Sequence, residues 1–199
     1  MIYLVRHGET AWNLTRCRQG RLDSPLTDRG VAQATATGRC LRALVNGRAV
    51  RIASSPLGRA MSTATIIADH LGIGKDLIVT DPLIAELHQG YWQGLAGAQI
   101  DERFPGARQE RARDKWEYVI PGGESYAQVH ERAAAWLDTV RQECILIAVA
   151  HEMIGRTIRG AYCHLDPKHI LALGHPHHTI YRLHGGKAEE IVCDRISDA

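Results

Sequence analysis

A short apolar strand that runs directly into an arginine and a histidine opens the chain, and this feature most constrains the fold. Residues 2–5 have the composition of a buried strand, and Arg6 and His7 follow at once. Such a strand carries its last side chains to one edge of a sheet, and open α/β sheets bind ligands at the carboxyl ends of their strands. We therefore expect Arg6 and His7 at a ligand-binding edge. Taken alone, this segment is equally consistent with Arg6 and His7 lying in a surface loop.

Two later strands end in a similar way. Residues 50–53 are followed by a loop that leads to Arg59. The uninterrupted apolar run 144–150, typical of a central strand buried on both faces, ends at His151. If the three strands are parallel neighbours, two imidazoles and two guanidinium groups meet at one edge. Because unpaired positive charge is costly in a protein interior, we expect an anion between them, and a phosphoryl group is the natural candidate.

The rest of the chain alternates apolar runs with helical patterns. Thr27 is expected to cap a helix that extends to about Leu44, and Gly72 to end the following long helix. Ser125 and Gln128 fit a capping box. Further helices are predicted at 98–104, 108–116, 153–162 and 167–173, and further strands at 77–80, 179–183 and 191–193. This alternation predicts a three-layer α/β/α sandwich with a mostly parallel central sheet.

The length of 199 residues predicts one domain, 1–199, with an irregular insertion at about 83–122 that faces the substrate. Glycines and prolines interrupt this insertion. It also carries a series of basic residues, most of which we expect on a solvated helix face, while one or two reach the substrate. These residues are Arg103, Arg108, Arg111, Arg113 and Lys115.

Composition narrows the class of protein. The net charge of +2 and the hydrophobic share of 45% give no indication of a nucleic-acid or membrane partner. The five scattered cysteines are odd in number and form no C-x-x-C pair, which favours free thiols in a reducing compartment. There is no signal-peptide pattern and no apolar run long enough to cross a bilayer. We therefore expect a cytoplasmic protein, and the sequence leaves its oligomeric state open, a homodimer included.

Six groups of residues, in order over nearly the whole chain, resemble the motifs of the histidine phosphatase superfamily, the phosphoglycerate mutase-like proteins. The groups are residues 4–10 with Trp12 and Asn13; Arg16, Gln19, Gly20, 23–27 and Gly30; 54–57 with Arg59, Ala60, Thr63 and Ala64; Glu86 with Gly90 and Gly94; 121–125; and Ala150 with His151. The resemblance implies a phosphoglycerate mutase-like fold and an enzyme that acts on a small phosphorylated metabolite. It also implies that no metal or other cofactor is needed.

The resemblance implies catalytic roles for five residues. His7 is the nucleophile that forms a phosphohistidine, with a hydrogen bond at its other nitrogen to fix the tautomer. Arg6, Arg59 and His151 hold the phosphoryl oxygens. Glu86 gives a proton to the leaving oxygen and later accepts one from the attacking water. A surface carboxylate after a strand is the alternative interpretation of Glu86.

Four further residues are implied to bind phosphate or substrate: Asn13, the Gln19–Gly20 turn, and the backbone of Glu152. The family often has glycine after its second histidine, whereas this chain has Glu152. The backbone N–H of Glu152 can still donate to phosphate, but we expect its side chain to point away, because it would repel the anion.

A second departure from the family is the histidine cluster His175, His177 and His178, which lies where many relatives carry an amide or a small polar residue. An exposed loop is the simplest interpretation of the cluster, and contact of one histidine with phosphate is a minority alternative. A zinc site is disfavoured, because a second pair of ligands at suitable spacing is missing.

The type of phosphoryl transfer is a separate question. Mutases of this superfamily carry a longer insertion with paired arginines after the glutamate, and no Arg-Arg pair occurs between Glu86 and Gly122. We therefore expect water to reach the phosphohistidine, which gives a phosphomonoesterase for a sugar phosphate or a phosphoglycerate-type ester. The alternatives are a phosphoglycerate mutase-type transfer and a non-catalytic phospho-ligand-binding relative. The latter would usually lack one of the catalytic residues, all of which are present.

Overall fold

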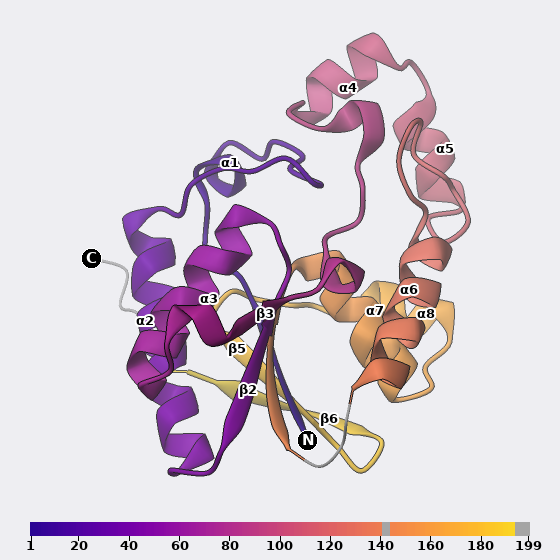
Figure 1. Cartoon of the computed structure of the whole chain (residues 1–199). Helices are drawn as coiled ribbons and strands as arrows, with labels where there is room; N and C mark the ends of the chain where they lie inside the picture. The colour runs from indigo at the N-terminus through magenta and orange to yellow at the C-terminus, as the bar shows by residue number, and fades with distance from the viewer. Residues whose placement is uncertain (141–143, 194–199) are drawn as a thin grey trace.

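The computed structural model describes residues 1–140 and 144–193, which form a six-stranded sheet in the order β3-β2-β4-β1-β5-β6 (Figure 1). The strands are β1 (Ile2–Arg6), β2 (Val50–Ser54), β3 (Ile78–Thr80), β4 (Ile145–Ala150), β5 (Thr179–His184) and β6 (Lys187–Val192). The first four are parallel, whereas β5 is antiparallel to both β1 and β6. Because β2, β4 and β1 are parallel neighbours, their carboxyl ends lie side by side, as the sequence predicted.

Helices cover both faces of this sheet, so the predicted α/β/α architecture is confirmed. In Figure 1, α2 and α3 lie on one side of the sheet and α6, α7 and α8 on the other. The helices are α1 (Ala11–Leu14), α2 (Asp28–Val45), α3 (Gly58–Leu71), η1 (Lys75–Leu77), η2 (Pro82–Ile84), η3 (Gly90–Trp92), α4 (Gly97–Arg103), α5 (Ala107–Arg113), α6 (Tyr126–Thr139), α7 (Glu152–Tyr162) and α8 (Pro167–Ala172).

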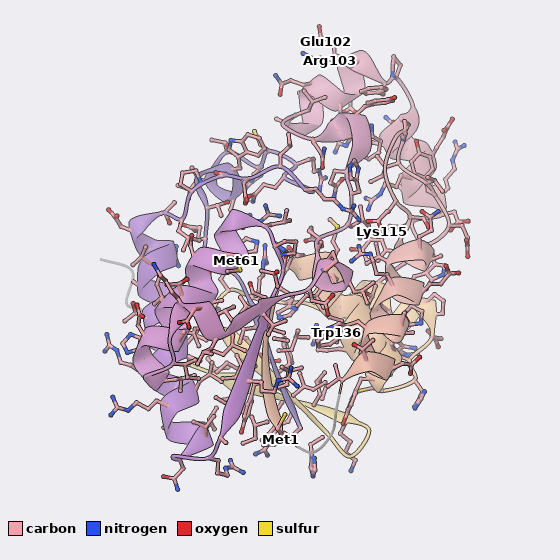
Figure 2. All side chains as sticks on the ribbon, in the orientation of Figure 1. Met1, Met61, Glu102, Arg103, Lys115 and Trp136 are labelled. Carbon is pink, nitrogen blue, oxygen red and sulfur yellow. The ribbon has the colours of Figure 1, made fainter. Side chains whose placement is uncertain are left out.

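The alternation of side chains along β1 divides the interior into two cores. Tyr3 and Val5 belong to the core beneath α2 and α3, whereas Leu4 belongs to the core beneath α6 and α7. Trp136, labelled in Figure 2, fills this second core from α6 and is 1% exposed. Since successive side chains of a strand point to opposite faces, a strand covered on both faces must be apolar at every position. This explains the uninterrupted apolar runs of the sequence.

The helix ends follow the predicted capping residues. The hydroxyl of Thr27 accepts a hydrogen bond from the Gly30 N–H at 3.0 Å and starts α2. Ser125 and Gln128 form the reciprocal capping box of α6. Gly72 ends α3 with φ of 68°, a left-handed conformation that glycine adopts without a steric penalty. Local sequence therefore sets these boundaries.

Several elements differ from the prediction. The helix predicted at 108–116 is α5, which already ends at Arg113, and η1 and η3 were not predicted. β6 starts at Lys187, whereas the sequence predicted only 191–193. Its first four side chains are exposed, so this edge strand lacks the apolar signal of a buried one. The short helix α1 was not predicted either. Its N-cap is Thr10, whose side chain forms a capping box with Asn13.

The segment 83–122 contains most of η2, then η3, α4 and α5. Residues 97–118, which we call the arm, project beyond the carboxyl ends of the strands (Figure 1). Glu102 and Arg103 lie at the outer tip of the arm, at the opposite end of the molecule from Met1 (Figure 2). In the described ranges no helix combines the length and apolar character that a membrane span requires.

Candidate active site

A cavity of about 110 Å³ lies at the carboxyl end of β1. It is lined by the end of β1, the loop after α1, the start of α3, the segment after η2 and the start of α7. The lining residues are Arg6, His7, Asn13, Cys17, Arg18, Gln19, Gly20, Arg59, Glu86, Gln89, Glu152 and Met153. The structure thus brings all of the predicted site residues except His151 to one cavity.

His7 is held as a neutral imidazole with a defined tautomer. Its Nδ1 lies 2.7 Å from the carbonyl oxygen of Gly8, which can only accept a hydrogen bond, so Nδ1 carries the proton. Nε2 keeps its lone pair and accepts a hydrogen bond from Nε of Arg59 at 3.3 Å. Burial lowers the pKa of His7 well below its usual value, and the neighbouring His151 and Arg59 lower it further. The nitrogen beside Arg59 is therefore unprotonated and nucleophilic.

His151 lies next to His7 but does not line the cavity. It follows β4 directly and is fully buried, with its ring centroid 5.0 Å from that of His7. The hydroxyl of Ser55 lies 2.7 Å from its Nε2 and orients the ring, a role that the sequence did not indicate. Its Nδ1 makes no hydrogen bond within the described ranges. Burial and the positive charges of Arg59 and Arg6 lower the pKa of His151, which favours the neutral ring.

Arg59 joins the start of α3 to the loop after α1. Its Nη1 donates to the Leu22 carbonyl at 2.7 Å and to the carboxylate of Asp23 at 2.9 Å, while Nη2 donates to the Gly20 carbonyl at 2.7 Å. Asp23 also accepts a hydrogen bond from the backbone N–H of Arg59 at 3.2 Å. These contacts fix the guanidinium so that its Nε faces His7.

Arg6 and Glu152 form an ion pair at the cavity wall, with 3.0 Å between Nη2 and Oε2. The other carboxylate oxygen of Glu152 is paired with Arg156, one turn further along α7. The expectation that this side chain points away from the site is therefore wrong. Arg6 and Arg156 neutralise the Glu152 carboxylate at the cavity wall. These charge-assisted contacts outweigh the preference of a carboxylate for open solvent. Nη1 of Arg6 donates to the His175 carbonyl at 2.9 Å.

Glu86 is buried at the amino end of α7. Its carboxylate accepts hydrogen bonds from the backbone N–H groups of Leu87 at 2.9 Å, Met153 at 3.2 Å and Ile154 at 3.1 Å. The first turn of a helix leaves its N–H groups unpaired and favours negative charge there, so Glu86 caps α7 from a distant segment. The same carboxyl group lines the cavity with the nucleophile, where it can exchange a proton with a ligand.

α1 and the loop after it supply polar groups to the cavity. Oδ1 of Asn13 accepts a hydrogen bond from the Thr10 N–H at 3.0 Å, which leaves the Nδ2 amide for a ligand. Oε1 of Gln19 is buried without a hydrogen-bond partner among the described residues. Gly20 has φ of 54°, and a Cβ there would lie 2.8 Å from the backbone nitrogen of Gln89, so only glycine fits. Glu152 is the first residue of α7, whose initial N–H groups lack helical partners.

The three clustered histidines occupy different environments. Nδ1 of His177 lies 2.6 Å from the carbonyl oxygen of His7, and burial with the charge of Arg6 lowers the pKa of His177 to about 3. His175 is buried and packs edge-on against Tyr181 at 5.1 Å. His178 is exposed. The ring of His177 therefore holds the backbone of the nucleophile His7 in place. The interpretation of the whole cluster as an exposed loop is wrong.

Four residues of the cavity were not assigned from the sequence: Cys17, Arg18, Gln89 and Met153. The first two directly precede Gln19, so their position in the same loop was the available signal. The other two reach the cavity through the path of η3 and α7, which no local pattern reveals. Across 1–140 and 144–193, no group of three or more His, Cys, Asp or Glu side chains is arranged to hold a metal ion.

Curated proteins with similar sequences include a probable phosphoglycerate mutase, GpmB, from Yersinia pestis. It is 42% identical over 141 residues, which are 69% of this chain and 61% of the relative. A GpmB of Yersinia pseudotuberculosis gives the same figures. This chain therefore matches less than two thirds of the length of those relatives.

Solved structures with the same fold cover nearly the whole chain. A mycobacterial glucosyl-3-phosphoglycerate phosphatase matches with a TM-score of 0.76, 28% identity and 96% coverage of both chains. YhfR of Bacillus stearothermophilus matches with 0.78 and 29%, over 96% of this chain and 95% of that one. A putative alpha-ribazole-5'-P phosphatase of Escherichia coli has a TM-score of 0.82 and 18% identity over 98% and 95%, which shows the fold alone.

A family model spans almost the entire sequence. Residues 2–198 match the model of the histidine phosphatase superfamily, branch 1. The parallel neighbours β2, β4 and β1 bring His7, Arg59 and His151 together. The chain belongs to the histidine phosphatase superfamily.

Proposed function

We propose that this enzyme is a phosphomonoesterase that hydrolyses a small phosphate ester, of the sugar phosphate or phosphoglycerate type, through a phosphohistidine on His7. The hydrogen bond from Nδ1 of buried His7 to the Gly8 carbonyl carries the proposal, because it leaves Nε2 as an unprotonated nucleophile beside the cavity. The name of the mycobacterial neighbour, a glucosyl-3-phosphoglycerate phosphatase, supports hydrolysis of this ester class.

In the first step, the lone pair of His7 Nε2 attacks phosphorus in line with the ester oxygen. The N–P bond forms as the P–O bond breaks, and the Glu86 carboxyl group gives its proton to the leaving oxygen. Arg6 and Arg59 neutralise the charge on the non-bridging oxygens, and the neutral ring of His151 contributes a hydrogen bond to one of them. Nε of Arg59, which donates to Nε2, transfers this hydrogen bond to a phosphoryl oxygen when the ligand binds.

In the second step, water attacks phosphorus from the side that the leaving group vacated. Its proton passes to the Glu86 carboxylate, the N–P bond breaks, and inorganic phosphate leaves with Nε2 restored. Asn13, Gln19 and the backbone N–H groups of Gly20 and Glu152 serve as further donors to phosphate or substrate. The positive charge that both steps require comes from the side chains of Arg6 and Arg59.

The alternative is a phosphoglycerate mutase-type transfer, which the 42% identity with GpmB favours. In that reaction the phosphohistidine returns its phosphoryl group to a different oxygen of the substrate. Assay of 3-phosphoglycerate with a bisphosphate primer separates the two reactions. Release of inorganic phosphate supports the phosphatase, and interconversion of phosphoglycerate isomers without release supports the mutase.

The nucleophile is tested by trapping the phosphoenzyme. The wild type, His7→Gln and the exposed-histidine control His178→Gln are mixed with a radiolabelled phosphate ester and quenched in alkali, where phosphohistidine survives. We expect labelled protein and turnover in the wild type and in His178→Gln. We expect neither in His7→Gln, with turnover reduced by a factor of at least about 10³. Equal labelling of His7→Gln and wild type would overturn the proposal.

A further inference from the structure

Glu86 lies on a segment that has no regular secondary structure. η2 ends at Ile84, and within 85–89 no residue belongs to a helix or a strand. The N–H groups of α7 hold the carboxylate, but the backbone on either side of it has no ladder of hydrogen bonds. Because backbone polar groups need partners and a functional side chain needs a rigid support, other contacts must hold this segment.

Arg132 of α6 binds the backbone on the amino-terminal side of Glu86. Its Nη1 donates to the carbonyl oxygens of Leu83 at 2.7 Å and Ala85 at 2.8 Å. Its Nε and Nη2 donate to the two carboxylate oxygens of Glu124, at 3.3 and 3.1 Å. A guanidinium group that is engaged by all three of its nitrogens is fixed in orientation. Arg132 therefore ties the residue directly before Glu86 to a helix that packs on the sheet.

Glu124 binds the backbone on the carboxyl-terminal side. Its Oε2 accepts a hydrogen bond from the His88 N–H at 2.8 Å, and its own N–H donates to the His88 carbonyl at 2.9 Å. The two segments lie so close that a Cβ at Gly123 would overlap the His88 carbonyl oxygen. Glu124 and Arg132 thus hold the chain on both sides of Glu86.

The pair is sheltered from solvent and lies outside the catalytic cavity. The side chains of Arg132 and Glu124 are 13% and 19% exposed, and Arg21 adds a contact to Glu124 at 3.2 Å from the loop after α1. Neither Arg132 nor Glu124 is among the described residues that line the cavity. Removal of two charges from water costs free energy that only good geometry and further hydrogen bonds offset. The further hydrogen bonds of this pair go to the backbone that carries Glu86.

We propose that Arg132 and Glu124 are positioning residues for the proton donor, an inference that rests on the proposed phosphatase function. They fix the backbone at residues 85 and 88, so that the Glu86 carboxyl group stays within hydrogen-bond distance of the leaving oxygen. Proton transfer needs heavy atoms about 2.6–3.2 Å apart, and a displacement of about 1 Å can reduce a rate by about 10². The pair therefore matters most for esters whose leaving oxygen must be protonated.

Two esters that differ in their leaving group test this inference. An alkyl phosphate needs a proton on its leaving oxygen, whereas 4-nitrophenyl phosphate releases a stable anion. We compare kcat/KM, which reports on formation of the phosphohistidine and not on its hydrolysis. The variants are Arg132→Lys, which keeps the charge but not the guanidinium geometry, and Glu124→Gln, each alone and combined with Glu86→Gln.

Two controls separate positioning from general effects. Glu131→Gln removes an exposed charge next to Arg132 on α6. Ile67→Val removes a methyl group from the core beneath α2 and α3, where Ile67 is fully buried, and so lowers stability without contact to the site. A thermal melt of every variant shows that it is folded.

We expect Arg132→Lys to reduce kcat/KM for the alkyl phosphate by about ten- to a hundredfold, and Glu124→Gln by about three- to tenfold. For 4-nitrophenyl phosphate both losses should be less than about threefold. In the Glu86→Gln background neither substitution should reduce the alkyl value by more than about twofold, because no proton donor is left to position. Both controls should keep the wild-type ratio of the two esters.

Equal losses on the two esters in every folded variant of the pair would overturn the inference, because a purely structural contact would act on both. A loss in the Glu86→Gln background as large as in the wild-type background would also overturn it. If Arg132→Lys does not fold, Glu124→Gln decides the question. Absence of His7-dependent hydrolysis for both esters would instead overturn the proposed function and this inference with it.

Discussion

Arg6 and Glu152 form an ion pair of 3.0 Å inside the cavity that contains the nucleophile. The carboxylate thus holds a guanidinium nitrogen that the proposed mechanism assigns to phosphate. A phosphoryl group that binds there must displace Glu152 or share Arg6 with it. Because of this competition, the Glu152 side chain influences how tightly an anion binds to Arg6.

We expect Glu152→Gln to bind inorganic phosphate more tightly, because the substitution removes a negative charge from the site and frees Arg6. The competitive inhibition constant for phosphate should fall by about three- to tenfold. Glu131→Gln, an exposed substitution on α6, is the control and should leave the constant unchanged. Weaker inhibition in Glu152→Gln would instead mean that the carboxylate is needed to position Arg6.

Replacement of the proton donor Glu86 should reduce the rate of ester hydrolysis to an extent that depends on the leaving group. Glu86→Gln retains the oxygen that accepts the hydrogen bonds of Leu87 and Ile154, whereas its NH2 group replaces the oxygen that accepts from Met153. The variant cannot protonate the leaving oxygen. We expect kcat for an alkyl phosphate to fall by a factor of about 10² to 10⁴, and kcat for an activated aryl phosphate to fall much less. Steady-state kinetics with both esters provides the measurement. An equal loss on the two esters would argue that Glu86 only caps α7.

The contact between the backbone at Gly8 and the start of α2 should be intolerant of a methyl group. A Cβ at Gly30 would overlap the Glu9 carbonyl oxygen, and one at Gly8 would overlap the Gly30 carbonyl. We expect Gly30→Ala to reduce the free energy of unfolding by about 2 kcal/mol or more, and to reduce activity because the turn after His7 shifts. Gly174→Ala, where a Cβ would meet nothing within 4 Å, is the control in urea denaturation.

Buried neutral histidines should make the fold sensitive to acid. Burial and the charges of Arg159 and Arg6 hold the pKa of His175 well below its usual value, so below about pH 6.5 the unfolded chain binds a proton that the folded chain does not. The free energy of unfolding should therefore decrease as pH falls through this range, by up to about 1.4 kcal/mol per pH unit for this residue. Urea midpoints between pH 7 and 5 test this, with His175→Leu expected to flatten the slope.

The matched control for this measurement is His178→Gln, because His178 is exposed. The control should keep the slope of the wild type. A slope in His175→Leu as steep as that of the wild type would show that other groups account for the acid sensitivity.

The sequence predicted the parts of the site that depend on local pattern. The apolar runs before His7 and His151 identify buried strands, and Thr27 and Ser125 place helix starts through hydrogen bonds within one turn. Ion pairs between distant segments could not be predicted in this way. The Glu152 side chain at the start of α7 lies in the cavity because Arg6 approaches it from the end of β1, which the sequence around Glu152 does not reveal.

The basic residues of the arm also show that local sequence does not reveal how distant segments pack. Arg111, Arg113 and Lys115 look alike in the sequence, and only their packing separates the exposed Arg113 from the two side chains over Tyr126. The strand β6 was shortened in the prediction for a related reason, because edge strands expose polar side chains that resemble those of a loop.

The pairing of β1 with β4 also joins two parts of the chain that are far apart in sequence. Ile2 lies opposite Leu146, so the first strand must wait for a segment made much later before it gains this neighbour. Closure of so long a loop costs conformational entropy and slows folding. His151 directly follows β4, so the arrangement that places its ring 5.0 Å from that of His7 depends on this long-range pairing and cannot form from the first part of the chain alone.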